Sequence, residues 1–282
     1  MPFTLAHPAA AVPFTKYRLP LSALVVGSMA PDFPYFIYLS TSHQYGHTLL
    51  GIFLFCVPVG LVVLGLFHGF LKRPLLSLLP TIHQARLVSV AKAFGFWPAR
   101  QLLLVVIALL LGASTHVAWD SFTHADGWSV QHIELLRWPL IQTSRGTLYV
   151  FKLLQHWSTL LGCALLAHWY RRWFKQAATQ VSTQPVPSLS SLPGLVPENL
   201  KGRLLWFMVG VAAIFAGLYS YGATSSSDGA SLLQLLLRNF VVMGVAAMGV
   251  ELVIFSGLWH LKAHRDSKFA DGELTGESVA KE

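Results

Sequence analysis

Long apolar segments alternate with short polar ones along the chain, and this pattern predicts membrane-spanning helices. A helix needs about 20 mostly apolar residues to cross a bilayer. Five runs come close to or exceed that length: 48–70, 102–119, 153–170, 204–221 and about 239–261. A sixth stretch, 19–30, is too short to cross and ends at Pro31-Asp32-Phe33-Pro34. We therefore predict an all-α, polytopic integral membrane protein with about five transmembrane helices and a re-entrant or buried N-terminal helix.

The composition excludes several classes of protein. Hydrophobic residues make up 54% of the chain and charged residues only 11%, whereas soluble globular proteins carry roughly 25% charged residues. An ordinary soluble enzyme and a disordered protein are therefore excluded. Cys56 and Cys163 both lie in apolar runs, which excludes a disulfide scaffold. The net charge of +8 is better explained by basic cytoplasmic loops than by a nucleic-acid partner.

The loop charges predict the orientation. Segments 71–100 and 171–203 are strongly basic, so the positive-inside rule places them in the cytoplasm and the alternate loops outside. We expect the protein to be integral to the plasma (inner) membrane with a cytoplasmic C-terminus. Four parts are predicted: a membrane-embedded module (1–175), a flexible cytoplasmic linker (176–200), a two-helix transmembrane hairpin (201–261) and a disordered tail (262–282).

The clearest chemical signal is a stripe of ionisable residues at the end of the second apolar run. His116, Asp120 and His124 stand at i, i+4 and i+8, which is one face of a helix. Imidazole and carboxylate groups on one face suit a transition metal, although polar helix ends facing headgroups would look similar. His47 opens the first predicted span and His156 opens the third, on the same side of the membrane.

Two further candidates lie near the N-terminus. Asp32 sits between prolines beside an apolar helix, where an unpaired carboxylate would be costly and a cation partner is expected. His7 precedes Pro8, and its spacing does not show whether it reaches the same side as the others.

Several motifs resemble one bacterial membrane family, catalogued as domain of unknown function 4184. The opening segment 1–9 (Met-Pro-Phe-Thr-Leu-Ala-His-Pro-Ala), segment 27–33 (Gly-Ser-Met-Ala-Pro-Asp-Phe) and segment 47–51 (His-Thr-Leu-Leu-Gly) carry the resemblance. Segments 119–124 (Trp-Asp-Ser-Phe-Thr-His) and 155–158 (Gln-His-Trp-Ser) continue it. The resemblance covers about residues 1–175, and the family has no established activity.

The order of ligand types is also similar, more distantly, to the superfamily of zinc-dependent phospholipase C and single-strand nucleases, with its predicted membrane-bound metal-dependent hydrolases. The soluble enzymes of that superfamily are all-α and hold a cluster of three zinc ions. The resemblance implies three groups of ligands: Asp32, His47, His116 and Asp120 for one metal, His7 and a bridging Asp120 for a second, and His124 with His156 for a third.

Two departures from that superfamily bear on the number of metals. Its third site ends in His-x-x-x-Glu, but Leu160 stands four residues after His156. The N-terminal Trp ligand of the soluble phospholipase is replaced by Met1. One or two ions are therefore expected rather than three.

The leading hypothesis is a membrane-bound, metal-dependent hydrolase with zinc as the expected divalent metal. Zinc lowers the pKa of a bound water to about 7 and polarises a phosphoryl group, while Asp32 or Asp120 would orient or deprotonate that water. A site at headgroup depth on the outer face suits a phosphodiester of a lipid or lipid-linked substrate, with membrane lipids as partners.

There are two alternatives. One is a non-catalytic protein with a structural metal, and the other is a metal or ion transporter. The apolar middles of the first two spans count against transport, although Glu251 interrupts the fifth. The oligomeric state is not indicated.

Overall fold

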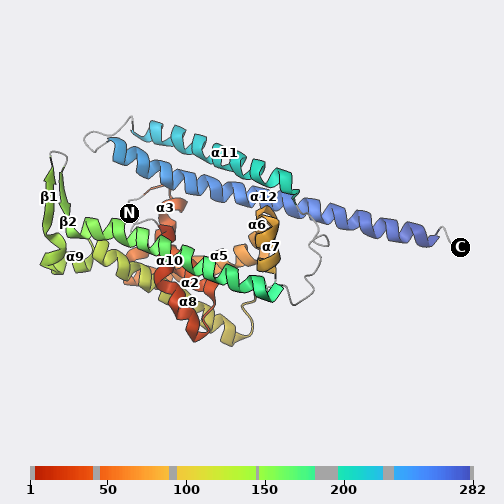
Figure 1. Ribbon diagram of the computed structural model, residues 1–282, viewed down its shortest axis with the longest axis horizontal. Helices are drawn as coiled ribbons and strands as arrows, with labels where there is room; N and C mark the ends of the chain where they lie inside the picture. Colours follow the sequence, from red (N-terminus) through yellow and green to blue (C-terminus); the bar gives the residue numbers. More distant parts are fainter. Residues whose placement is uncertain are drawn as a thin grey trace. The chain divides into compact units, whose positions relative to one another are not determined.

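The structure is a computed structural model, which describes residues 4–40, 45–88, 94–143, 146–181, 196–224 and 232–279 (Figure 1). The shorter helices are α1 (Pro8–Ala11), α2 (Leu21–Met29), α3 (Phe33–Ile37), α4 (Leu49–Gly51), α5 (Val57–Leu66), α6 (Lys72–Leu78), α7 (Thr81–Val88) and α9 (Trp128–His132). The long helices are α8 (Ala99–Thr123), α10 (Val150–Val181), α11 (Glu198–Thr224) and α12 (Leu232–Val279). One antiparallel hairpin is formed by β1 (Pro139–Thr143) and β2 (Gly146–Tyr149).

The predicted fold class is confirmed. Five stretches of helix are long and apolar enough to cross a membrane: Leu49–Leu78, Ala99–His132, Val150–Ala177, Glu198–Gly222 and Leu235–Asp266. They correspond one to one with the five apolar runs of the sequence. The first stretch joins α4, α5 and α6 through two π-helical turns, η5 (Ile52–Cys56) and η6 (Phe67–Leu71). The β-hairpin was not predicted, because its strands are too short for a clear alternation.

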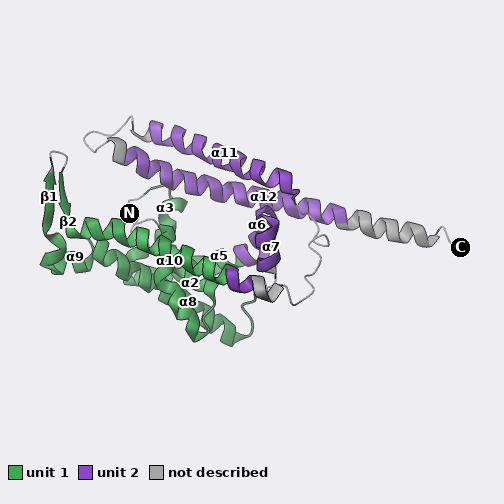
Figure 2. Cartoon of the chain, viewed as in Figure 1, with its two compact units in different colours: residues 1–65, 94–174 green, residues 66–93, 175–282 purple. Residues whose placement is uncertain are grey.

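The chain divides into two compact units (Figure 2). Unit 1 contains residues 1–65 and 94–174, and unit 2 contains residues 66–93 and 175–282. The first unit ends close to the predicted boundary at residue 175. Residues 66–93, however, group with the rear helices and not with the front module.

In unit 1, α2 packs directly against α8, and two glycines allow the close approach. A Cβ atom on Gly112 would lie 2.5 Å from the Leu24 carbonyl oxygen, and one on Gly27 would lie 2.5 Å from that of Leu109. Leu24, Leu109 and Ala113 are fully buried around this contact. The short N-terminal helix is therefore a buried core element, as its apolar sequence predicted.

The connection from α8 to α10 contains α9, a short 3-10 turn η7 (Glu134–Arg137) and the β-hairpin, which extends across the direction of α10 (Figure 1). Val130 and Leu136 pack with Phe151 at the start of α10 and form a small core of their own. This packing holds α9 and η7 against the start of α10.

Unit 2 is built on the hairpin of α11 and α12. Lys201 is buried and donates to the Leu79 carbonyl oxygen at 2.8 Å and to Glu198 at 2.6 Å. His260 of α12 hydrogen-bonds to the Phe70 carbonyl oxygen at 2.9 Å. Helix α12 extends to Val279 and so enters segment 262–282, which was predicted to be a disordered tail. Most of the predicted linker, 182–195, lies outside the described residues.

Candidate metal centre

His116 and Asp120 project from the same face of α8, one turn apart. His116 is completely buried, and its Nδ1 lies 2.7 Å from the Ser28 carbonyl oxygen of α2. That oxygen only accepts, so Nδ1 carries the proton and Nε2 is left with a free lone pair. A backbone carbonyl that fixes the tautomer in this way is the usual second partner of a metal-binding histidine.

Asp32 and His47 are brought to these residues by two short turns. Asp32 ends the 3-10 turn η3 (Ala30–Asp32) after α2, and its Oδ2 accepts a hydrogen bond of 2.6 Å from the Thr4 hydroxyl. His47 ends η4 (Tyr45–His47), directly before the first spanning helix. Gly46 packs against the backbone of Pro31 so closely that a Cβ atom would overlap it. This contact places His47 beside Asp32.

The four side chains present four ligand atoms to a common point. His47 Nε2 lies 3.4 Å from Asp32 Oδ1 and 3.4 Å from Asp120 Oδ2. His116 Nε2 lies 3.6 Å and 3.2 Å from the same two oxygens. One ligand atom from each residue lies within 4.8 Å of all the others. Each imidazole nitrogen therefore stands between two carboxylate oxygens.

The four nitrogen–oxygen distances are close to those between the ligands of a divalent metal. Zinc bonds of about 2.0–2.2 Å at tetrahedral angles place neighbouring ligand atoms about 3.3–3.6 Å apart. His116 Nε2 is buried and makes no hydrogen bond of good geometry to any described residue, although carboxylate oxygens are near. Burying an unsatisfied polar atom is costly, and a cation between the four residues removes that cost. Nitrogen and carboxylate ligands suit zinc and also manganese or iron.

Asp120 has a second oxygen, and two further histidines face it. Oδ1 lies 3.5 Å from His7 Nε2 and 3.5 Å from His124 Nδ1. His7 is only 1% exposed and stacks on His116 with ring centroids 3.8 Å apart. Neither ring nitrogen of His7 has a hydrogen-bond partner among the described residues. The structure thus brings His7 and His124 together on the other side of Asp120.

The charges of the groups outside the spanning helices are set by burial and by their neighbours. Burial lowers the pKa of His7 to about 3, so His7 is neutral and able to bind a metal at physiological pH. Burial opposes ionisation of Asp32, but the neighbouring His116 and His47 imidazoles and the hydrogen bond from Thr4 outweigh it and hold the pKa of Asp32 well below its usual value. Burial also disfavours the charged form of His47, but Asp120 and Asp32 raise its pKa overall.

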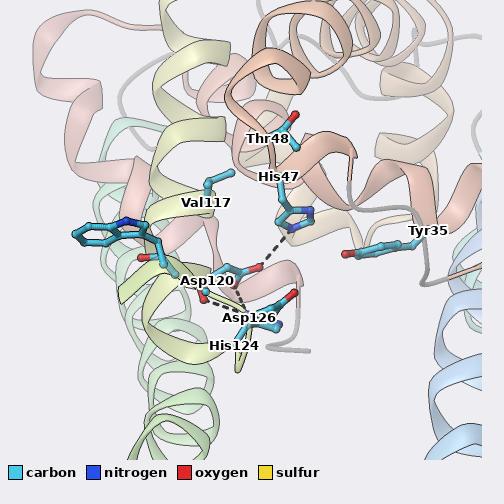
Figure 3. A pocket seen from close by; sticks show the side chains of 10 residues that line it. Tyr35, His47, Thr48, Val117, Asp120, His124 and Asp126 are labelled. Atoms are coloured by element: carbon cyan, nitrogen blue, oxygen red, sulfur yellow. Dashed lines mark hydrogen bonds and ion pairs between the residues drawn. The ribbon is translucent and has the colours of Figure 1, made fainter. Parts of the chain in front are cut away.

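A pocket of about 280 Å³ opens onto one side of the cluster (Figure 3). Within the cluster, the side chains of His47 and Asp120 are 19% and 11% exposed, whereas those of His116 and Asp32 are 0% and 5% exposed. Figure 3 shows Asp120 between His47 and His124, with the Tyr35 hydroxyl directed toward them. The remaining lining residues are Thr48, Val117, Ser121, Asp126, Gly127 and Trp128.

The structure does not bring His156 into this group. His156 is exposed on α10, whereas the adjacent Gln155 is buried and accepts a hydrogen bond of 3.2 Å from Lys152. Successive side chains of a helix point about 100° apart, so His156 can be exposed while its neighbour Gln155 is buried.

Sequence reasoning missed Thr4 and Tyr35, for which the sequence contains no distinguishing pattern. Their roles depend on contacts between distant segments.

Fold and site together define a helical protein compatible with an integral membrane location, with a His₂Asp₂ cluster that can hold a metal ion. The chain matches the family model described as Domain of unknown function (DUF4184) over residues 1–257, and it belongs to that family. The match extends well beyond residue 175 and includes α11 and most of α12. No curated protein and no solved structure matches the chain, so the distant resemblance to zinc-dependent phospholipases and nucleases is not shown.

Proposed function

We propose that the protein is a membrane-bound, metal-dependent hydrolase that cleaves a phosphodiester of a lipid or lipid-linked substrate. One divalent ion, with zinc as the expected metal, is held by Asp32, His47, His116 and Asp120. The observation that carries this proposal is the combination of four converging ligand atoms with a pocket that reaches two of the ligands, His47 and Asp120. A substrate in that pocket can approach the ion from the exposed side.

Hydrolysis adds one water across a P–O bond. The water oxygen bonds to phosphorus, the ester P–O bond breaks, and the leaving oxygen takes up a proton. A bound divalent ion lowers the pKa of water and polarises the phosphoryl group. The protein supplies the groups that position the reactants and move the protons. The two aspartates of the cluster, Asp32 and Asp120, differ in the hydrogen bonds that they accept.

Asp120 is better placed than Asp32 to orient the attacking water. Asp32 Oδ1 faces the cluster and Oδ2 is already bonded to Thr4. Asp120 Oδ1 is free of hydrogen bonds from the described residues, so it can accept a proton from water. Burial raises the pKa of Tyr35, which keeps its phenol protonated and able to donate to a substrate oxygen.

A second ion would use Asp120 Oδ1 together with His7 Nε2 and a ring nitrogen of His124, whose Nδ1 also lies 3.3 Å from the Asp120 carbonyl oxygen. His7 Nε2 and His124 Nδ1 each lie 3.5 Å from that oxygen of the Asp120 carboxylate, a separation close to that of two ligand atoms on one zinc ion. Two metal equivalents per chain would make Asp120 a bridging ligand. One equivalent would leave its Oδ1 for water.

A structural metal site is the second candidate function. Four protein ligands can complete a tetrahedral shell, as in structural zinc sites, whereas catalytic zinc sites keep one position open. A shell that stays closed would hold α8 to the N-terminal turns without catalysis. Hydrolysis measurements on the metal-loaded protein separate the two candidates.

The site is proposed to face the outside of the plasma membrane. The basic segments 71–100 and 171–203 flank the opposite ends of the spanning helices, and such segments remain cytoplasmic. Cysteine labelling of intact cells that carry either Gln142→Cys or Arg171→Cys tests this orientation. Only the cysteine at position 142 should be labelled from outside.

The first experiment measures metal content and hydrolysis of phosphatidylglycerol and a soluble phosphodiester, bis(p-nitrophenyl) phosphate. The wild type is compared with His116→Ala and, as a matched control, His156→Ala. His116→Ala should lose the metal and lower activity by at least about a hundredfold, while His156→Ala retains both. Metal that is retained with no hydrolysis of either substrate would favour the structural candidate. Full activity in His116→Ala would refute the assignment.

A further inference from the structure

The pocket next to the metal ligands has an apolar rim. Thr48 lines the pocket, and Leu49 and Leu50, which follow it, are 77% and 60% exposed. Trp128, which lines another side, is 69% exposed. A site that takes its substrate from water would be expected to have a polar rim, because exposed apolar groups there would be poorly solvated.

The apolar rim continues as a stripe along the first spanning helix. Leu49, Leu50, Phe53 and Leu54 are all more than half exposed, whereas Gly51, Ile52 and Cys56 are buried against the rest of unit 1. The exposed pair Leu49 and Leu50 recurs four residues later as Phe53 and Leu54, which places the exposed side chains on one side of a helix. The stripe begins at the pocket and leads into the stretch Leu49–Leu78, which is long enough to cross the membrane.

We infer that this stripe, defined by Leu49, Leu50, Phe53 and Leu54, is an acyl-chain track for a phospholipid whose phosphate lies in the pocket. The inference rests on the proposed metal-dependent function and specifies its substrate class: a membrane amphiphile that enters sideways from the leaflet next to the pocket. Continuity between the stripe and the pocket is the reason for choosing a single lipid as the occupant. An amphiphile bound in this way keeps its chains in the bilayer while its phosphate reaches His47 and Asp120.

Photo-crosslinking tests the track without requiring hydrolysis. Phosphatidylglycerol with a diazirine in one acyl chain is added to the full-length protein in liposomes, with and without bound zinc, and labelled peptides are mapped by mass spectrometry. Labelling of residues 49–54 should increase several-fold in the zinc-loaded protein and return to its basal level in His116→Ala. Labelling at Leu160 and Leu161 of α10, which are 63% and 60% exposed, should not change.

Two pairs of variants test the effect on substrate choice. Leu50→Ser/Leu54→Ser should lower kcat/KM for phosphatidylglycerol at least about tenfold and leave hydrolysis of bis(p-nitrophenyl) phosphate unchanged. Leu160→Ser/Leu161→Ser, at positions of equal exposure, should leave both substrates unchanged. Unaltered metal content shows that each variant is folded.

Three outcomes overturn the acyl-chain track. Labelling that does not depend on zinc and is equal at residues 49–54 and at Leu160 and Leu161 would mean that the stripe contacts ordinary bilayer lipid only. Absence of lipid labelling at residues 49–54 with and without zinc would mean that the stripe is covered by protein. An equal loss of both activities in Leu50→Ser/Leu54→Ser would mean a structural role. Failure of the wild type to hydrolyse either substrate would instead refute the proposed function, and the zinc-dependent labelling would still report on the track.

Discussion

At the scale of single residues, Asp120 is the side chain around which the candidate metal centre is arranged. Its Oδ2 lies 3.2 Å from His116 and 3.4 Å from His47, and its Oδ1 lies 3.5 Å from His7 and from His124. The spacing of His116, Asp120 and His124 on one helical face was visible in the sequence. The different partners of the two oxygens were not, because His7 and His47 come from other segments.

The protonation of His47 predicts how metal affinity depends on pH. The aspartates raise the pKa of His47 in the metal-free protein, and only the neutral imidazole binds metal. A metal ion must therefore displace a proton whenever the pH lies below that pKa. Lowering the pH from about 7.5 to about 5.5 should weaken zinc binding, with a slope that approaches about tenfold per pH unit for the one proton displaced from His47 once the pH lies below its pKa.

Isothermal titration calorimetry in buffers of different ionisation enthalpy measures both the affinity and the protons released. His7, whose pKa is lowered to about 3, contributes no proton in this range. Affinity that is independent of pH over the same interval would contradict the placement of His47 among the ligands.

At the scale of elements, the contact between α2 and α8 positions the site. Gly112 and Gly27 let the two backbones approach, and this approach brings the Ser28 carbonyl oxygen within 2.7 Å of His116 Nδ1. The sequence indicated a buried helix near residues 19–30 but did not indicate its partner. Which helices pack together depends on matching surfaces, and the period of the apolar residues does not specify this.

Replacing Gly112 by alanine should damage both the packing and the site. Its Cβ atom would lie 2.5 Å from the Leu24 carbonyl oxygen and 2.6 Å from the Ser28 nitrogen, so the helices must separate. Overpacking of this kind costs about 1–3 kcal/mol, and zinc affinity should fall because His116 loses its carbonyl partner.

The matched control is Gly210→Ala on α11, where a Cβ atom meets nothing within 4 Å. This change should be neutral or slightly stabilising, since alanine favours a helix over glycine by about 0.5–1 kcal/mol. Thermal unfolding in detergent and zinc titration distinguish the two variants. Equal behaviour of both would show that α2 and α8 are not in close contact.

At the scale of the whole molecule, the centre joins segments that are far apart in the chain. Asp32 and His47 come from separate turns near the N-terminus, while His116 and Asp120 come from α8. An ion bound by all four residues therefore links these segments in the folded state. The unfolded chain has no preformed site, so metal binding adds directly to folding stability.

Removing the metal should lower the thermal stability of the protein, and zinc should restore it. A free zinc concentration about a hundred times Kd contributes about 2.7 kcal/mol. The measurement is the unfolding temperature after chelation and after zinc is returned, with His116→Ala as the control. The variant should not respond to either treatment, and a wild type that also fails to respond would argue against the site.

The sequence by itself determined the helical class, the five apolar spans and most of the ligand types, because these depend on local composition and helical period. The tertiary structure decided which ligands meet. It joined Asp32 and His47 to His116 and Asp120, placed His7 and His124 at the other Asp120 oxygen, and left His156 exposed. Convergence requires close backbone contacts such as those at Gly46 and Gly112. Those contacts depend on packing between distant segments, which no local pattern encodes.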